Sequence, residues 1–179
     1  MHPIELNYEL TLSDFRKATY YGLVSLHRTA IVIMLAVLSS IAVYLAAAKA
    51  AAQRPNPAVW FLATAYLVWV ILLCAGAERG IHSYLKDPNS MIGVPYRTTL
   101  DEDSIRLRVP SRGIDQFHRY KKLFCVIELS SLILVYLNSQ EVWLIPKRSL
   151  TDGQLAAARE VFRSGLDTRF RSRFMKKKK

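Results

Sequence analysis

The sequence predicts a membrane α+β protein: a two-helix transmembrane hairpin inserted in a small antiparallel β-barrel or sheet with a C-terminal helix. Two uncharged runs, residues 29–48 and 55–77, predict the membrane part. At 1.5 Å per residue, each would form a helix of about 30 Å or more, enough to cross a hydrocarbon core. Alternating apolar and polar residues, both before the first run and after the second, predict the sheet.

The composition also points to a membrane. The chain has 179 residues, 51% of them apolar, and a formal net charge of +11. This apolar content excludes a disordered chain, and the two uncharged runs argue against a soluble nucleic-acid binder. Two runs of this length in so small a chain argue against buried core helices. A signal peptide is disfavoured because the first run is long and a second follows at once.

The distribution of Lys and Arg predicts the orientation of the hairpin. Three of these residues precede the first run, two lie in the link and twenty follow the second run. By the positive-inside rule, the protein is a multi-pass protein with both termini in the cytoplasm. We expect five parts: a strand and juxtamembrane helix at 1–28, the hairpin at 29–77, a juxtamembrane linker at 78–94, a cytoplasmic domain at 95–167 and a basic tail at 168–179.

The cytoplasmic part is expected to be one sheet with contributions from both sides of the hairpin. Ile4 to Leu10 alternate strictly, and because a lone strand is unstable, this segment must join the later strands. Ser13 is the predicted cap of the helix that follows. Later segments rich in β-formers and separated by turn residues predict further strands, at 105–109, 122–129, 132–137 and 142–145. A helix capped near Thr151 ends the domain.

Two segments carry a family resemblance. Residues 8–18 read YELTLSDFRKA and residues 145–150 read IPKRSL. Together with the two spans, these segments resemble the bacterial YcxB-like membrane proteins. The resemblance implies a pleckstrin-homology-like (PH-like) domain attached to a two-helix hairpin in the bacterial inner membrane, and it implies no reaction. A tryptophan often found in a middle strand of the family is absent here, and Phe117 is its nearest substitute.

The sequence offers no catalytic, cofactor or metal motif, so we expect no enzyme. The four histidines are scattered, and the acidic run at 101–103 is typical of a hairpin turn. Cys74 and Cys125 fall in a membrane run and a cytoplasmic segment, where they are expected to act as small apolar residues.

Clusters of cations are the candidate contacts for lipid or a partner. Arg106 and Arg108 share the polar side of a strand, and Lys147 and Arg148 follow the last strand. Each pair is either a solvated surface or a site for anionic lipid or an acidic partner. The tail adds the cations Arg169, Arg171, Arg173, Lys176, Lys177, Lys178 and Lys179. It is either a solvated end or a segment that docks on anionic lipid, whereas nucleic-acid binding is disfavoured.

These observations favour a non-catalytic scaffold or adaptor. Its partners would be the bilayer, an anionic lipid, and an unidentified protein or a second copy of the chain. Two alternatives stay open at this point. One is an immunity-type or regulatory protein that restrains a toxin or envelope enzyme, and the other is an accessory subunit of a transport assembly.

Overall fold

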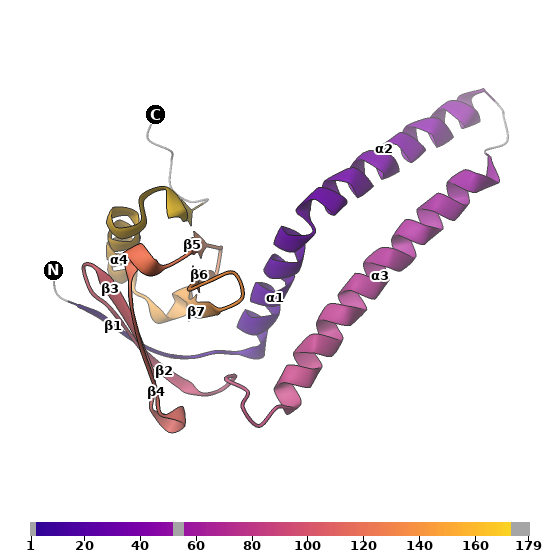
Figure 1. The fold of residues 1–179 in the computed structure, drawn as a ribbon. Helices are drawn as coiled ribbons and strands as arrows, with labels where there is room; N and C mark the ends of the chain where they lie inside the picture. The colour runs from indigo at the N-terminus through magenta and orange to yellow at the C-terminus, as the bar shows by residue number, and fades with distance from the viewer. Residues whose placement is uncertain (1–2, 52–55, 173–179) are drawn as a thin grey trace. The chain divides into compact units, whose positions relative to one another are not determined.

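The computed structural model describes residues 3–51 and 56–172, and it divides into two compact units. The first, here called the sheet unit, is built from Met1–Ala18 and Asn89–Lys179. The second, here called the helix unit, is Thr19–Pro88. The sheet unit is therefore assembled from both sides of the helical insertion, and Figure 1 shows the elements of each unit.

The first sheet joins the N-terminal strand to the strands that follow the insertion. Its strands are β1 (Ile4–Glu9), β2 (Pro95–Leu100), β3 (Ser104–Val109) and β4 (Ile114–Arg119), in that spatial order and all antiparallel. β1 pairs with β2 from Ile4 opposite Leu100 to Glu9 opposite Pro95. The predicted N-terminal strand is thus confirmed. The alternation that predicted it buries Leu6 and Tyr8 on one face of the sheet.

The second sheet corrects two details of the expected architecture. Its strands are β5 (Cys125–Glu128), β6 (Leu132–Tyr136), β7 (Val142–Pro146) and β8 (Phe170–Ser172), in the spatial order β7-β6-β5-β8. The strands therefore form two separate four-stranded sheets and no closed barrel. β8 comes from the predicted tail and pairs with β5 in parallel. The Phe170 ring, with its centroid 6.0 Å from that of Phe162, anchors β8 by apolar contact.

The inner faces of the two sheets form the core. Ile105 of β3 and Val126 of β5 are fully buried. His118 of β4 meets Trp143 of β7 edge to face, with ring centroids 5.3 Å apart. This contact shows that the two sheets pack with these faces toward each other, as in a sandwich.

The predicted C-terminal helix is confirmed as α4 (Asp152–Leu166). Thr151 and Gln154 form a reciprocal capping box at its start. Its apolar side is buried, and Phe162 lies edge-on to Tyr120 with centroids 5.6 Å apart. Short 3-10 turns connect the elements: η1 (Pro110–Arg112), η2 (Tyr120–Lys122), η3 (Lys147–Ser149) and η4 (Asp167–Arg169).

The helices of the insertion begin and end differently from the sequence-based expectation. α1 (Leu12–Leu26) is capped by Thr11 and not by Ser13, because the Thr11 hydroxyl and the Asp14 carboxylate accept each other's backbone N–H groups. α2 (Arg28–Ala50) contains the first uncharged run, and α3 (Pro57–Lys86) contains residues 57–77 of the second. Because α3 continues to Lys86, half of the predicted linker at 78–94 is helical.

α2 and α3 are long and apolar enough to cross a membrane. Their 23 and 30 residues correspond to about 35 Å and about 45 Å. The most apolar stretch of each helix has no buried residue, whereas a core helix of a soluble protein is mostly buried. The hydroxyls of Ser39, Ser40 and Thr64 each donate to the backbone carbonyl four residues earlier, which satisfies them without water. These features indicate membrane association.

Candidate binding surface

The outer face of the first sheet gathers cations around one exposed aromatic ring. Alternation along β3 sends Ile105, Leu107 and Val109 into the core, so Arg106 and Arg108 lie on the opposite face. The cross-strand register places residues of β2 and β4 beside them. We call this surface the arginine face, and its members are Arg97, Arg106, Arg108, Asp115, Phe117 and Arg119.

One carboxylate serves two guanidinium groups on the arginine face. Arg106 donates to both oxygens of Asp115, from Nε at 2.8 Å and from Nη2 at 2.6 Å. Arg108 Nε donates to the same carboxylate at 3.3 Å. The hydrogen bonds that Arg106 donates to Asp115 lower the pKa of the Asp115 carboxyl and raise the pKa of the Arg106 guanidinium. Two guanidinium groups thus share one carboxylate, which leaves one surplus positive charge.

Arg97 adds a further positive charge to the face. It lies opposite Arg108 across the β2–β3 pair, and like charges in this arrangement repel. In the described part of the chain, no hydrogen bond or ion pair is formed by the Arg97 side chain. Glu5 and Glu9 of β1 lie only diagonally from it, on either side of its partner Asn7. An anion bound at this face would relieve the repulsion.

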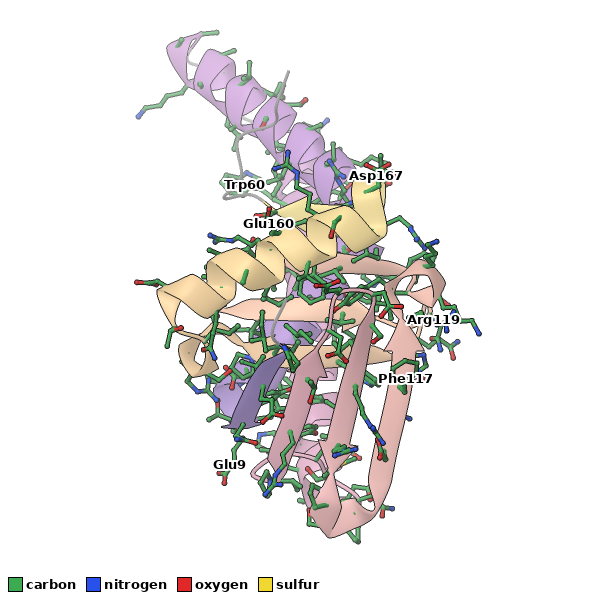
Figure 2. All side chains as sticks on the ribbon, turned by 90° about the vertical axis from the view of Figure 1, so that its left-hand side faces the viewer. Glu9, Trp60, Phe117, Arg119, Glu160 and Asp167 are labelled. Atoms are coloured by element: carbon green, nitrogen blue, oxygen red, sulfur yellow. The ribbon has the colours of Figure 1, made fainter. Side chains whose placement is uncertain are left out.

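Phe117 is 56% exposed and lies opposite Arg106 across the β3–β4 pair. Figure 2 labels it on β4 together with Arg119, at the end of the strand that leads into η2. Phe117, the nearest substitute for the absent tryptophan, therefore lies on the outer face of the first sheet. The ring is on the outer face because His118, and not Phe117, points into the core.

Lys147 and Arg148 both form ion pairs within the sheet unit. Lys147 Nζ lies 2.5 Å from Oε1 of Glu128, and its side chain is only 13% exposed. Arg148 Nη1 donates to Asp14 at 2.8 Å, and Nη2 donates to the Glu9 carbonyl at 2.8 Å. Lys147 is thus an internal ion-pair partner, while Arg148 ties η3 to the start of α1 and leaves half of its side chain exposed.

Lys147 belongs to a buried ionic cluster around Glu128, here called the Glu128 cluster and made of Glu128, Lys147, Arg159 and Ser172. Arg159 of α4 donates from Nε at 3.1 Å to both carboxylate oxygens and from Nη2 at 2.6 Å. Ser172 of β8 donates at 2.5 Å. Burial alone would raise the pKa of Glu128, but the hydrogen bonds from Arg159, Lys147 and Ser172 outweigh it, so the pKa lies below its ordinary value.

The candidate cations of the tail fall into two groups. Arg169 donates to the carbonyls of Lys121 and Leu123, so it helps to hold the end of α4 against η2. Arg171 is exposed on β8, opposite Ile127. The remaining tail cations, Arg173 and Lys176 to Lys179, lie outside the described residues.

The chemistry of the arginine face suits binding. A guanidinium group stays protonated at neutral pH, so it does not act as a general base, but its planar fork matches the oxygens of phosphate or carboxylate. Within residues 3–51 and 56–172, no group of three or more His, Cys, Asp or Glu side chains is arranged to hold a metal ion. Burial raises the pKa of the Cys125 thiol, which makes it a poor nucleophile.

Six residues of these sites were not found from the sequence: Arg97, Asp115 and Arg119 of the arginine face, and Glu128, Arg159 and Ser172 of the Glu128 cluster. For Arg97 the sequence carried a signal, because Arg97 alternates with Tyr96, Thr98 and Leu100. These three side chains are buried, so the alternation places Arg97 on the other side of the strand. Glu128 had none, because a single acid within an apolar strand does not show which cations the fold brings to it.

Residues 100–162 match the family model described as YcxB-like protein. This match confirms the resemblance for the segment from the end of β2 into α4, which contains most of the arginine face and the IPKR sequence at 145–148. A search of curated proteins and a search of solved structures each found no significant match.

Proposed function

We propose that this chain, whose residues 100–162 form a YcxB-like domain, is a non-catalytic adaptor of the bacterial inner membrane. In this proposal α2 and α3 anchor the protein, and the arginine face of the sheet unit binds the headgroups of anionic lipids. The observation that carries the proposal is the surplus of guanidinium groups around the exposed Phe117 on a chain that also has two apolar helices.

The charge distribution supports a topology with both termini in the cytoplasm. Lys and Arg are few before the first span and in the link, whereas twenty follow the second span. The sheet unit then lies on the cytoplasmic side, where anionic lipids are abundant. Its two antiparallel-rich sheets and C-terminal helix support a PH-like unit.

The connection to the membrane favours lipid over a soluble acidic protein. Arg97 is eleven residues after Lys86, the last residue of α3. At about 3.6 Å per residue, the chain holds Arg97 within about 40 Å of that helix end. The headgroups are therefore at high local concentration. Each cation near an anionic surface contributes about 1 kcal/mol, and the Phe117 ring can insert among the headgroups.

The full chain, reconstituted in nanodiscs with or without phosphatidylglycerol, tests the lipid assignment. A polarity-sensitive dye at Ser111→Cys, an exposed position in η1, reports contact with lipid once Cys74 and Cys125 are replaced by alanine. We expect a blue shift only with phosphatidylglycerol, and its loss at high salt.

The critical variant replaces three cations of the face by glutamine, at Arg97, Arg106 and Arg108. Its matched control removes three exposed cations elsewhere in the sheet unit, namely Lys121, Lys122 and Arg163. The proposal requires the blue shift to disappear only in the first variant. Equal blue shifts in both lipid mixtures would overturn the proposal. It would also be overturned if an acidic protein bound in a way that required the arginine face while lipid binding did not require it.

The topology has its own test. An impermeant thiol reagent should label Ser111→Cys only after the cells are opened. Labelling of intact cells from outside would overturn the cytoplasmic placement of the sheet unit.

A further inference from the structure

An apolar groove lies between α2 and α3. It has a volume of about 410 Å³ and is lined by Ala30, Ile33, Leu62, Ala65, Tyr66 and Trp69. Only two of these side chains carry a polar group, the Tyr66 hydroxyl and the Trp69 indole N–H. In the part of the chain that the structure describes, neither group forms a hydrogen bond.

The depth of Tyr66 makes an unpaired hydroxyl costly. Along α3, the nearest charged residue is Glu78, about 18 Å away at 1.5 Å per residue. If α3 crosses a membrane, the hydroxyl of Tyr66 lies in hydrocarbon. A hydroxyl there without a hydrogen-bond partner is unfavourable, because it has left water without gaining a replacement for its hydrogen bonds. The groove therefore favours an occupant that is apolar, slender and provided with one hydrogen-bond acceptor at this depth.

The chain itself carries such a surface on α2. Ala36 and Ser40 are both exposed and lie four residues apart, so they share one side of the helix and allow close approach. The Ser40 hydroxyl donates to the Ala36 carbonyl at 2.9 Å, which leaves its lone pairs free to accept. It is not bonded to Tyr66 of the same chain.

The depths of donor and acceptor agree. Ser40 is about 15 Å from Ala50, where α2 ends, and Tyr66 is about 14 Å from Pro57, where α3 begins. Both distances are measured from the link of the hairpin. Two copies inserted in the same direction would therefore bring Ser40 of one and Tyr66 of the other to the same level in the membrane.

We propose that α2 of a second copy of this chain fills the groove, with Ser40 of that copy accepting a hydrogen bond from Tyr66. This inference rests on the proposed membrane insertion, but not on lipid binding by the arginine face. It makes the protein a dimer through its helix unit, with the small residues Ala36 and Ser40 of α2 at the interface.

Disulfide cross-linking in membranes tests the pairing. The full chain is expressed as two tagged copies in which Cys74 and Cys125 are alanine, one with Ser40→Cys and the other with Ala65→Cys. Mild oxidation should join the two tags. The control is Ala42→Cys in place of Ser40→Cys, because a shift of two residues turns the cysteine about 200° around the helix at nearly the same depth. Cross-linking should fall several-fold in the control.

Removal of the hydroxyl tests the hydrogen bond. In vesicles, energy transfer between labelled copies should show about threefold weaker association for Tyr66→Phe, which is the average 0.6 kcal/mol of an interhelical hydrogen bond at 1.4 kcal/mol per tenfold. Ser40→Ala should weaken association similarly, and the double variant should lose no more than either single variant. Tyr21→Phe, which lies outside the groove, should leave association unchanged.

The possible outcomes separate this inference from the proposed insertion. If alkaline carbonate extracts the protein from membranes, the insertion itself fails. If the protein stays in the membrane but cross-linking is equal for Ser40→Cys and Ala42→Cys, or if Tyr66→Phe has no effect, the second copy is not the occupant. The groove would then be filled by lipid or by another membrane protein.

Discussion

Replacing Glu128 by glutamine should strongly destabilise the sheet unit. The substitution keeps the size and shape of the side chain and removes only its charge. In the structure this carboxylate is 1% exposed and receives Lys147, Arg159 and Ser172 from three elements outside its own strand. Glu128→Gln leaves two cations facing a neutral amide.

The magnitude follows from how well those cations can reach water. Breaking a buried ion pair by removing one partner costs about 3–5 kcal/mol, because the remaining charge is buried without compensation. The side chains of Lys147 and Arg159 are 13% and 26% exposed, so both remaining charges are partly solvated. The expected cost is therefore near the lower end of this range, at about 3 kcal/mol. For a unit of roughly one hundred residues, this corresponds to a fall in Tm of more than about 10 °C.

The same cluster predicts a dependence on pH. The pKa of Glu128 is lower in the folded protein than its ordinary value, because the hydrogen bonds to its carboxylate outweigh burial. The stabilisation is therefore complete above the ordinary pKa of a glutamate. Below that pH the unfolded chain binds a proton first, and the stabilisation is lost as the pH falls through the folded pKa. The difference in Tm between wild type and Glu128→Gln should shrink as the pH is lowered from neutral to below about 4.

Thermal unfolding of the full chain in detergent, followed by near-UV circular dichroism, measures these differences. A triple variant, Glu128→Leu with Lys147→Met and Arg159→Met, is the control, because replacing all the charges of such a cluster by apolar groups is often neutral. A loss of less than about 1 kcal/mol for Glu128→Gln, or a triple variant as unstable as the single one, would refute the reasoning.

Two further substitutions test other contacts by the same measurement. Gly165→Ala would place a Cβ 2.8 Å from Cδ2 of the buried Tyr120, and we expect a loss of about 1–3 kcal/mol; Gly153→Ala, with open space around it, should lose nothing, and equal behaviour of the two would contradict the close approach. Asp14→Asn removes the negative charge that pairs with Arg148 at a buried position, which should cost about 1–3 kcal/mol. An unchanged Tm would show that this ion pair does not hold α1 to η3.

Those parts of the fold that depend on local periodicity could be predicted from the sequence. Apolar and polar residues alternate strictly from Ile4 to Leu10, and only a strand would bury all the apolar ones on one side. The structure pairs this strand with β2. The two uncharged runs likewise predicted α2 and α3, because length and composition suffice for that inference. The cap of α1 was misplaced by two residues, since Thr11 and Ser13 are both favoured cap residues and the sequence alone slightly prefers Ser13.

The parts that depend on tertiary pairing could not be predicted. β8 is a three-residue strand in a segment whose cations outweigh its apolar residues, and its pairing depends on Phe170 meeting Phe162 and on Ser172 meeting Glu128. No pattern within the segment shows that such partners exist. Composition therefore assigned residues 170–172 to a free tail.

The IPKR sequence at 145–148 illustrates how the cations of a signature can form contacts within the fold. Its two cations are adjacent in the chain, yet Lys147 reaches into the Glu128 cluster and Arg148 reaches Asp14 at the first turn of α1. The first contact joins η3 to β5, and the second joins η3 to the first turn of α1. A turn that holds these elements together tolerates few substitutions whether or not the domain binds anything there. The more informative positions for function are those whose charge the fold leaves exposed and in excess, and in this chain they are on the arginine face.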